Sequence, residues 1–563
     1  MRRLNVGLIA AIFLALVMIF ARLGDLPLRD PDEGRNAQVA REMLASGSWL
    51  TPTYNGWVYL DKPSFFFKSV ALCFEVFGES EFTARLPSAL FACGLLWMVY
   101  GFCRREYDAQ TGALAVIIVG TMPLFVALAR HVLFDMTLAF FVCGATFAGY
   151  FAEANEGARQ RNRYLLGAFL SGCGTLVKGP VGFIVPIFVL AIFNIVERRT
   201  GWWKRMFHPL NIVVFFGTTL PWFIGLSMQH PDFPHYGLVE ESVKRFGTNT
   251  FSRSAPVYYY ALVLLGGAFA WSVLLPEATV AAWRARAQWS RADRLLIIWT
   301  VAVLIFFSIS RSKLPHYVLT ALVTVGMLTA RLFAFALQRP ESAATRVILR
   351  GLIFLTALSV AAGAFLVINI LYPDAHRTVF KIRSREFEHF TLAFRSGAWA
   401  MGVIAAVAIA ARISRSMRVA LAAFLVLPLF FITFGFNGIA QYSEASSARQ
   451  LAQQLSKLPS NVEIACQESW PFGLDYYLNR KVTLITSSGS EISPYIVYSL
   501  KNMTNWPAGA VRVSEEKQWL ASRKGAVYLV ANDRAKSALR AIAQEQNVAL
   551  DHLTPGWWGL NLR

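Results

Sequence analysis

Charged residues are scarce in this sequence, and their scarcity excludes most soluble folds. Only 16% of the 563 residues are Asp, Glu, Lys or Arg, whereas about a quarter are charged in a typical soluble domain. Hydrophobic residues make up 55% and fall in long runs, which excludes a disordered or collagen-like chain. Apolar runs of about 20 residues cross a bilayer as helices. The composition therefore predicts an all-α polytopic membrane protein.

Cysteine is also scarce. The six cysteines are scattered, and no pair has the Cys-x-x-Cys or Cys/His spacing of a zinc site. This excludes a small scaffold held together by disulfides. We expect reduced thiols with a packing role.

Acidic residues are outnumbered by basic ones, 34 to 54, which gives a net charge of +20. In a soluble protein this excess would suggest nucleic acid, but no basic stripe lies on a soluble segment. Arginines crowd instead into alternate short loops, for example Arg104-Arg105 and Arg159–Arg163. That pattern is typical of the cytoplasmic side of a membrane protein. We therefore expect membrane lipids, and no nucleic acid, as partners.

Hydropathy windows predict about 13 transmembrane helices. The first, 6–21, follows two N-terminal arginines and lacks a small-x-small cleavage site, so we expect a retained helix with a cytoplasmic N-terminus. An odd number of spans puts the C-terminus on the other side. Residues 24–81 are too many for a simple loop. Within them, Asn36–Ala45 and Phe65–Phe77 repeat apolar residues at helical spacing, which predicts interfacial helices.

The composition changes after about residue 440. We expect residues 1–440 to form the transmembrane domain, with the interfacial helices of 24–81, and residues 441–563 to form a small α/β domain outside the cytoplasm. Ser443 is the expected N-cap of a helix that reaches Leu458. This domain has no converging acid, base or nucleophile. The expected strands are Val462–Cys466, Val482–Thr486 and Ala526–Val530, and further helices are expected over Glu515–Ser522 and Arg534–Glu545.

The first cluster with chemical potential begins directly after the first span. Asp30, Asp32 and Glu33 place three carboxylates within four residues, beside Arg35. The structural alternative is a helix start, in which Asp30 caps the helix and Glu33 favours its dipole. Two further clusters predicted on the same side favour a functional role.

The second cluster is Tyr59-Leu60-Asp61-Lys62-Pro63. An ammonium at the membrane surface can hold a phosphate as a point charge, although a lysine that snorkels from an interfacial helix is the alternative. The third cluster contains Asp135 at the outer end of a span. An ionisable residue there suggests function, and an N-cap is the alternative. We expect Asp32 and Asp135 to face one cavity.

Other cations and aromatics are predicted on the same side, and together the groups suit a sugar–phosphate reaction. Carboxylates orient or deprotonate hydroxyl and amine groups, and cations stabilise a departing phosphate. No cofactor is required, although the sequence leaves room for a divalent cation. Residues that could ligate one are Asp30, Asp61, His230 and His235; further cations and aromatics are Lys178, Arg245, Lys313 and Tyr317.

Several motifs resemble glycosyltransferase family 83, in the GT-C superfamily. The later motifs of that family match Leu176-Val177-Lys178-Gly179 and Ser312-Lys313-Leu314-Pro315, followed by Tyr317. The resemblance covers about residues 25–320; Asn36 departs from it where the family has Tyr. The first-loop match comprises Asp32-Glu33-Gly34-Arg35-Asn36-Ala37, Arg41-Glu42-Met43-Leu44-Ala45-Ser46-Gly47-Ser48-Trp49, Pro52 and Asp61-Lys62-Pro63.

This family contains the 4-amino-4-deoxy-L-arabinose transferase for lipid A. The resemblance implies transfer of that aminosugar from undecaprenyl phosphate to lipid A phosphates at the periplasmic face of a bacterial inner membrane. The product lowers surface negative charge and gives resistance to polymyxin. From the residue clusters and the resemblance together, we expect Asp32, Asp135 and Glu33 to be the catalytic residues. We expect phosphate or lipid binding by Lys62, Arg35, Tyr59, Lys178, Arg245, Lys313 and Tyr317.

Two alternatives remain open. A protein O-mannosyltransferase-like GT-C enzyme would also use a polyprenyl-phosphate sugar, but its hydroxyl acceptor would need a true general base. A lipid flippase or transporter would have a similar number of spans. It should show inverted repeats and interrupted mid-membrane helices, and the sequence shows neither.

Overall fold

The computed structural model describes residues 2–237, 240–241, 255–372, 391–432, 436–503 and 505–562. The chain divides into two compact units, each built from three separate stretches. We call them the helical unit (Met1–Leu23, Ser88–Leu220 and Ser242–Gln441) and the mixed unit (Gly24–Pro87, Pro221–Glu241 and Tyr442–Arg563). Each is described by itself.

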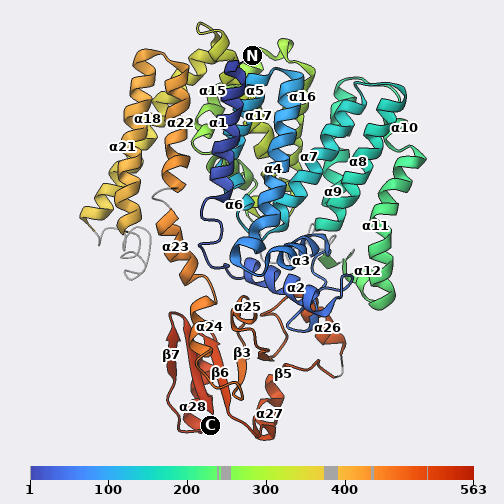
Figure 1. Ribbon diagram of the computed structural model, residues 1–563, viewed down its shortest axis with the longest axis vertical. Helices are drawn as coiled ribbons and strands as arrows, with labels where there is room; N and C mark the ends of the chain where they lie inside the picture. The colour runs from blue at the N-terminus through green and yellow to red at the C-terminus, as the bar shows by residue number, and fades with distance from the viewer. Residues whose placement is uncertain are drawn as a thin grey trace. The chain divides into compact units, whose positions relative to one another are not determined.

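The helical unit consists of apolar helices packed largely side by side, as α7 and α8 or α18 and α21 show (Figure 1). Helices α4, α11 and α23 each continue into the mixed unit. The helices are α1 (Arg2–Phe20), α4 (Glu81–Glu106), α5 (Ala109–Gly120), α6 (Pro123–Ala129), α7 (Phe134–Ala152), α8 (Gly157–Lys178), α9 (Val181–Val196), α10 (Trp202–Met206), α11 (Pro209–Gln229), α14 (Tyr259–Gly267), η2 (Trp271–Leu274), α15 (Leu275–Arg284), η3 (Arg286–Gln288), α16 (Arg291–Ile309), η4 (Pro315–Val318), α17 (Leu319–Gln338), α18 (Ala343–Leu371), α21 (Thr391–Ser414), α22 (Met417–Phe430) and α23 (Phe436–Ala445).

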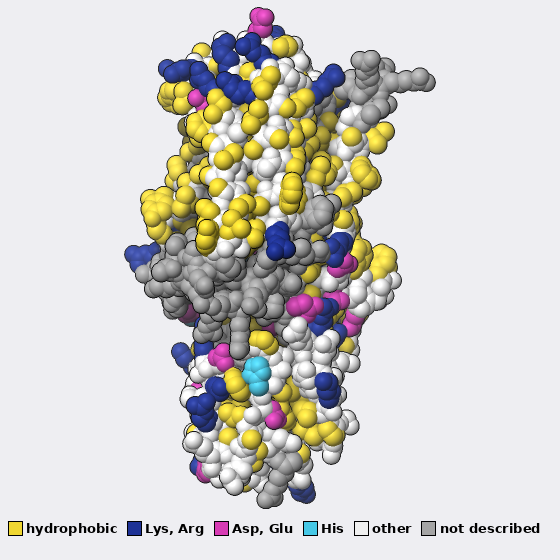
Figure 2. Space-filling view, turned by 90° about the vertical axis from the view of Figure 1, so that its left-hand side faces the viewer, with side chains coloured by type: hydrophobic (Ala, Val, Ile, Leu, Met, Phe, Trp, Pro, Cys, Tyr) yellow, Lys and Arg dark blue, Asp and Glu magenta, His cyan; other side chains and the backbone are white. Residues whose placement is uncertain are grey.

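Many of these helices are suited to cross a membrane. Among the described residues, seven are long and apolar enough, or up to nine if each of two bent helix pairs is one span, and three shorter apolar helices accompany them. The predicted helical membrane class is confirmed, and the number of about thirteen spans stays a prediction. Helices α18 and α21 expose large apolar side chains such as Phe354 and Trp399. Figure 2 shows hydrophobic side chains over this face, with Lys and Arg gathered at one end.

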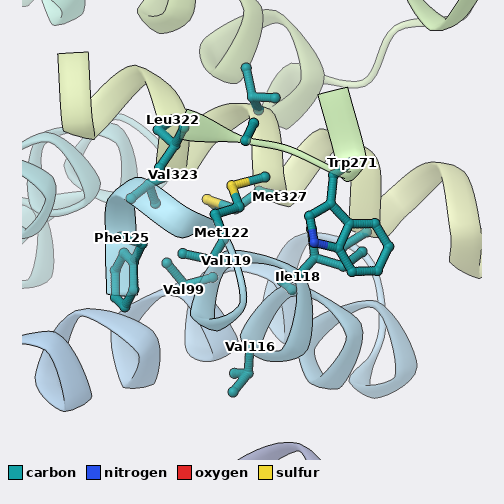
Figure 3. Close-up of a cluster of buried hydrophobic side chains, with 14 of the residues drawn as sticks. Val99, Val116, Ile118, Val119, Met122, Phe125, Trp271, Leu322, Val323 and Met327 are labelled. Carbon is teal, nitrogen blue, oxygen red and sulfur yellow. The ribbon is translucent and has the colours of Figure 1, made fainter. Parts of the chain in front are cut away.

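The core of the helical unit is formed where α4, α5 and α17 meet. Val99, Val119 and Met327 are fully buried there, and the Trp271 ring lies in the same cluster (Figure 3). The indole N–H of Trp271 donates to the Thr121 hydroxyl at 3.1 Å, so the one polar atom of that ring is satisfied.

The mixed unit contains a six-stranded sheet in the order β5-β4-β3-β6-β8-β7. Strands β5, β4, β3 and β6 are parallel, and β8 and β7 are antiparallel to their neighbours. The strands are β3 (Glu463–Gln467), β4 (Thr483–Thr486), β5 (Ala510–Arg512), β6 (Val527–Asn532), β7 (Asp551–Thr554) and β8 (Trp557–Leu562); the helices around them are α24 (Arg449–Leu455), α25 (Leu474–Leu478), α26 (Pro494–Asn502), η6 (Val513–Glu515), α27 (Glu516–Ser522) and α28 (Lys536–Glu545).

The three predicted strands are confirmed within a residue or two, because each is a short β-branched run that the sheet buries. The hairpin of β7 and β8 was not predicted, although Pro555-Gly556 between the strands is a turn signal. The prediction of Ser443 as an N-cap was wrong. Ser443 lies inside α23, and its hydroxyl donates to the Pro27 carbonyl at 3.1 Å.

The first loop packs against the C-terminal stretch, whereas the sequence grouped it with the membrane-spanning part. It contains α2 (Asp32–Ser46), the hairpin β1 (Thr53–Tyr54) and β2 (Trp57–Val58), and α3 (Phe65–Phe77); α12 (Phe233–His235) belongs to the same unit. The Tyr54 hydroxyl donates to the Phe472 carbonyl at 2.6 Å, and the Trp57 indole donates to the Ala508 carbonyl at 2.9 Å. Helices are present at both places in the loop where the sequence predicted them, and their position at a membrane interface stays a prediction.

Candidate active site

The acidic motif forms the first turn of α2, where carboxylates favour the helix dipole. The N-cap is Pro31, and it makes no side-chain capping bond, so the expectation that Asp30 caps this helix was wrong. Its carboxyl group is buried, beside the backbone amides of Gly473 and Phe472 and the Arg35 guanidinium. Burial raises the pKa of Asp30 to about 7, while these three neighbours oppose the rise.

Asp32 is the accessible carboxylate of the motif. Its side chain is 52% exposed, and its Oδ1 lies 2.5 Å from the Arg35 guanidinium. Arg35 in turn stands over the rings of Tyr59 and Phe472, 5.8 and 5.4 Å from their centroids. Because Arg35 is held by an ion pair and two aromatic faces, its charge is fixed in place beside an open carboxylate.

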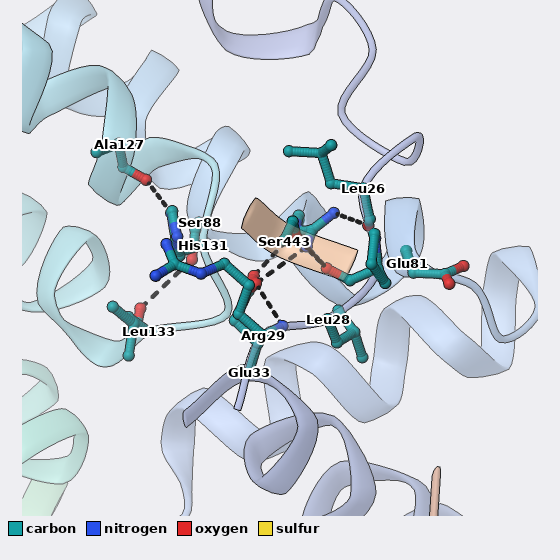
Figure 4. A network of polar contacts seen from close by, with 12 residues as sticks. Leu26, Leu28, Arg29, Glu33, Glu81, Ser88, Ala127, His131, Leu133 and Ser443 are labelled. Carbon is teal, nitrogen blue, oxygen red and sulfur yellow. Dashed lines mark hydrogen bonds and ion pairs between the residues drawn. The ribbon is translucent and has the colours of Figure 1, made fainter. Parts of the chain in front are cut away.

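Glu33 has the opposite environment. Its side chain is 2% exposed, and its two oxygens receive Nε and Nη2 of Arg85 at 2.9 and 3.0 Å. It also accepts the Arg29 N–H at 3.1 Å, and Figure 4 shows the two residues next to each other. Arg85 further donates to the Leu26 and Pro27 carbonyls. A carboxylate with this many buried donors fits a structural role better than contact with a substrate.

Asp61 and Lys62 form a second charged group, with Glu241. The Asp61 carboxylate accepts the Tyr236 hydroxyl at 2.7 Å and the Tyr495 N–H at 2.9 Å. Lys62 donates to the Asp61 carbonyl at 2.7 Å and forms an ion pair with Glu241. Burial and the Glu241 charge raise the pKa of Asp61, and Lys62 opposes them. The Lys62 side chain is only 15% exposed, so it does not snorkel at a surface.

Two further groups near these clusters are buried, and of the two only Tyr59 was predicted from the sequence. Tyr59 is almost fully buried, and burial raises the pKa of its phenol, although the nearby Arg35 opposes the rise. Asp475 is buried at the start of α25, and neither of its carboxyl oxygens has a hydrogen-bond partner among the described residues. Burial raises the pKa of Asp475 well above its usual range. Only the fold brings Asp475, 400 positions away, to the first loop.

The helical unit has its own acid–cation cluster. Asp135 lies in the first turn of α7, whose N-cap is Leu133, so the alternative that Asp135 is an N-cap was wrong. Its Oδ1 is 2.5 Å from the Lys178 ammonium, at the last residue of α8, and its Oδ2 is 3.7 Å from Nε2 of His316. The Lys178 ammonium also stands 5.0 Å from the centroid of the Tyr317 ring. Three motifs far apart in the sequence thus meet at one carboxylate.

For the other residues predicted for the site, the structure gives less support. Lys313 is buried and donates to the Ser310 carbonyl at 2.8 Å, within its own loop. Arg245 lies outside the described residues.

No group of three or more His, Cys, Asp or Glu side chains is arranged to hold a metal ion within the described part of the chain. His235 stacks near Tyr498, with ring centroids 6.4 Å apart, and His230 lies 3.4 Å from the Thr51 hydroxyl. One oxygen of Asp61 already accepts two hydrogen bonds. These positions give a metal-dependent step no support, and we derive none.

Each unit therefore presents carboxylates paired with cations and bordered by aromatic rings. Such groups can hold an ammonium on a carboxylate and a phosphate on a lysine or arginine. Glu241, Tyr236 and His316 were not predicted as site residues, because only tertiary contacts reveal them. Asp32 and Asp135 belong to different units, and their common cavity stays a prediction.

Comparison with known sequences shows that the chain is similar to transferases named for lipid-linked sugar donors. A family model described as dolichyl-phosphate-mannose-protein mannosyltransferase matches residues 61–224. The undecaprenyl phosphate-alpha-4-amino-4-deoxy-L-arabinose arabinosyl transferase of Shewanella sediminis is 26% identical over 508 residues, 88% of each chain. Transferase 2 of the same description from Sodalis glossinidius is 34% identical over 327 residues, 56% of this chain and 59% of that protein.

The fold has a solved counterpart. The crystal structure of ArnT from Cupriavidus metallidurans bound to undecaprenyl phosphate matches 98% of this chain and 97% of that chain, with a TM-score of 0.81 and 24% identity. Its apo state gives a TM-score of 0.80. At this level of identity the likeness establishes the fold, including the helical membrane part and the C-terminal sheet.

Proposed function

We propose that this chain is an ArnT-like, multi-pass membrane glycosyltransferase of the GT-C class and that it transfers 4-amino-4-deoxy-L-arabinose from undecaprenyl phosphate to lipid A phosphates, and its similarity to such transferases supports this. The reaction takes place at the periplasmic face of a bacterial inner membrane. The added amine lowers the negative charge of the cell surface and weakens binding of polymyxin and other cationic peptides.

The chemistry of the acceptor limits what the residues have to do. A phosphate monoester is ionised near neutral pH, so the acceptor needs no strong general base. Asp32, the exposed carboxylate, orients the donor by holding its sugar ammonium, and Asp135 is the second carboxylate of the reaction. Lys62, Arg35 and Lys178 stabilise the charge that develops on the departing carrier phosphate. Tyr59, Tyr317, Lys313 and Arg245 are proposed to shape or charge the lipid-phosphate site, whereas Glu33 is reassigned to a structural role.

A single observation carries this proposal. The similarity to the aminoarabinose transferase of Shewanella sediminis extends over 88% of both chains, so it is not confined to one motif. The acid–cation pairs Asp32–Arg35 and Asp135–Lys178 supply the two kinds of group that a cationic sugar on a phosphate carrier requires.

Mass spectrometry of lipid A tests the proposal. Lipid A from a host that makes the aminoarabinose donor but lacks its own transferase should gain the mass of one or two aminopentose residues when this chain is expressed. The purified protein should form the same product from undecaprenyl phosphate-aminoarabinose and lipid A. An unchanged lipid A spectrum with correctly inserted protein would contradict the proposed function.

The mannosyltransferase family match over residues 61–224 favours one second candidate, a protein O-mannosyltransferase-like reaction. A serine or threonine hydroxyl would then have to lose its proton, so Asp32 would act as a general base. Asp32→Asn should abolish that reaction, whereas transfer to a phosphate should keep a measurable residual rate. Mannosylated periplasmic proteins, found only when the chain is expressed, would support this candidate.

We also propose a cytoplasmic N-terminus and a periplasmic C-terminal domain, on the basis of the arginine-rich alternate loops. A C-terminal fusion to alkaline phosphatase should be active, and a fusion to a cytoplasmic reporter should be inactive. The reverse pattern would contradict this orientation.

A further inference from the structure

Lys62 is held by a carboxylate that the sequence analysis did not single out. Its ammonium forms an ion pair with Glu241, from the stretch that follows α12, and both side chains are mostly buried. The proposed function gives the same ammonium a phosphate to bind. We infer that Glu241 is a displaceable counter-ion, which the carrier phosphate replaces on Lys62 and which returns to Lys62 when the carrier leaves. This inference rests on the proposed role of Lys62.

The charges around Lys62 explain why displacement is needed. The Glu241 carboxylate is paired with the Lys62 ammonium, while burial and the Glu241 charge raise the pKa of Asp61 and the charges of Lys62 and Arg35 oppose that rise. A phosphate that approached Lys62 with Glu241 still in place would meet the negative charge of that carboxylate in a partly dry site, where repulsion between like charges is strong. The Glu241 carboxylate must therefore move away or be neutralised.

Glu241, rather than Asp61, is the carboxylate placed to move. Asp61 is held by the Tyr236 hydroxyl and by the backbone N–H of Tyr495 at the start of α26. Displacing Asp61 would break contacts to two other segments. The Glu241 carboxylate contacts the ammonium itself, so it occupies the position that a phosphate oxygen would take.

The reaction changes the charge on the carrier, and this gives the exchange a direction. The donor is a phosphodiester with one negative charge. When the bond from the anomeric carbon to the carrier oxygen breaks, its electron pair stays on that oxygen. An oxygen of the lipid A phosphate forms the new bond, so the carrier becomes a monoester with up to two charges and the acceptor loses one. Lys62 then binds the product more strongly than the donor, and Glu241 competes to release it.

The binding test uses the purified full-length protein in nanodiscs, with undecaprenyl phosphate as the probe. Glu241→Gln removes the competing charge while it keeps the shape, so undecaprenyl phosphate should bind about tenfold tighter, the effect of losing one charge-assisted contact. Lys62→Ala should bind it about tenfold or more weakly. In the double variant the gain from Glu241→Gln should vanish, because the two residues act through one contact.

A kinetic measurement separates this role from a merely structural one. In Glu241→Gln, the single-turnover rate should match that of the unmodified protein, while steady-state kcat falls and inhibition by undecaprenyl phosphate becomes stronger. Glu79→Gln is the matched control, because it also removes one negative charge from the mixed unit but its partner is Arg41. It should leave affinity and both rates unchanged.

The outcomes distinguish the inference from the function on which it rests. If Lys62→Ala weakens undecaprenyl phosphate binding but Glu241→Gln does not strengthen it, the counter-ion role is wrong and the phosphate role of Lys62 stands. If Lys62→Ala changes nothing, the role of Lys62 itself is wrong. Lipid A is titrated in parallel; tighter binding of lipid A alone in Glu241→Gln would mean that the acceptor phosphate displaces Glu241, and would overturn the inference.

Should Glu241→Gln fail to fold, Glu241→Asp must bind undecaprenyl phosphate more tightly than the unmodified protein, because its shorter arm weakens the pair.

Discussion

Asp32 and Glu33 are neighbours in the chain, but their side chains lie in different environments. Asp32 is half exposed beside Arg35, and Glu33 is buried against Arg85. Successive helix residues are about 100° apart around the axis, so one faces the interior of the mixed unit and the other does not. A motif of adjacent acids therefore contains one exposed carboxylate and one buried, ion-paired carboxylate.

Neutral variants of these two acids should separate activity from stability. Asp32→Asn should lower kcat/KM by about tenfold to a hundredfold, the loss expected for one charge-assisted contact, with the melting temperature unchanged. Glu33→Gln should destabilise the protein by about 3–5 kcal/mol, because it leaves the Arg85 charge buried and unpaired. Transfer assays and thermal unfolding of both purified variants measure this, and a stable but inactive Glu33→Gln would return Glu33 to the catalytic group.

Asp30 predicts a pH dependence of stability. Burial raises its pKa from 3.8 to about 7, so the folded protein binds a proton more tightly than the unfolded chain does. The contribution of Asp30 to stability is complete below about pH 4 and is lost as the pH rises through about 7. The melting temperature of Asp30→Asn should fall less between pH 5 and 8 than that of the unmodified protein. Parallel curves for the two proteins would rule out this role of Asp30.

At the scale of elements, α8 and α9 meet through glycines. A Cβ added at Gly182 would lie 2.2 Å from the backbone carbonyl carbon of Gly174. Small residues allow helix backbones to approach this closely in membrane proteins. The contact lies a few residues from Lys178, which ends α8 and pairs with Asp135. The glycine pair therefore helps to position a charged residue of the candidate site.

Gly182→Ala should test this contact, because backbone atoms cannot yield as a flexible side chain can. We expect a loss of about 1–3 kcal/mol of stability, the usual cost of overpacking, and a clear loss of transfer activity. Gly217→Ala in α11 is the control, since a Cβ at Gly217 meets nothing within 4 Å. It should be neutral or slightly stabilising, as alanine favours helix. Equal melting temperatures for the two variants would contradict the role of the α8–α9 contact.

At the scale of the whole chain, the first loop and the C-terminal stretch form one unit. Trp57 of the loop is 6% exposed, and its ring lies 6.1 Å from that of Trp470. Arg41 donates to the Tyr476 carbonyl at 2.8 Å, and the Asn55 amide donates to the Val482 carbonyl at 2.9 Å. Segments more than 400 residues apart should therefore unfold together.

Trp57→Ala should lower the melting temperature of the whole mixed unit, because truncating a buried tryptophan costs about 3–5 kcal/mol. Limited proteolysis should then cut both within residues 24–87 and within residues 442–562. Trp49→Ala is the control in the same loop, where the side chain is 38% exposed, and it should leave both stretches protected. Cleavage confined to the loop would show that the two stretches fold independently.

The sequence determined the membrane class, the presence of two helices in the first loop and three strands of the C-terminal sheet. These features follow from local periodicity and from the length of apolar runs, which can be recognised in each segment of the sequence alone. Family motifs also pointed to Asp32 and Lys62, and its place at the end of a predicted span pointed to Asp135.

Only the tertiary structure decided which partners those residues have. Burial separates Glu33 from Asp32, and packing brings Glu241 to Lys62 and His316 to Asp135. It also assigns the loop of residues 24–87 to the unit that holds the C-terminal sheet. Such contacts join residues up to several hundred positions apart, and a periodic pattern of apolar and polar residues carries no record of them. The pKa of an ionisable group in this protein depends on its burial and on its neighbours, and both exist only after the chain has folded.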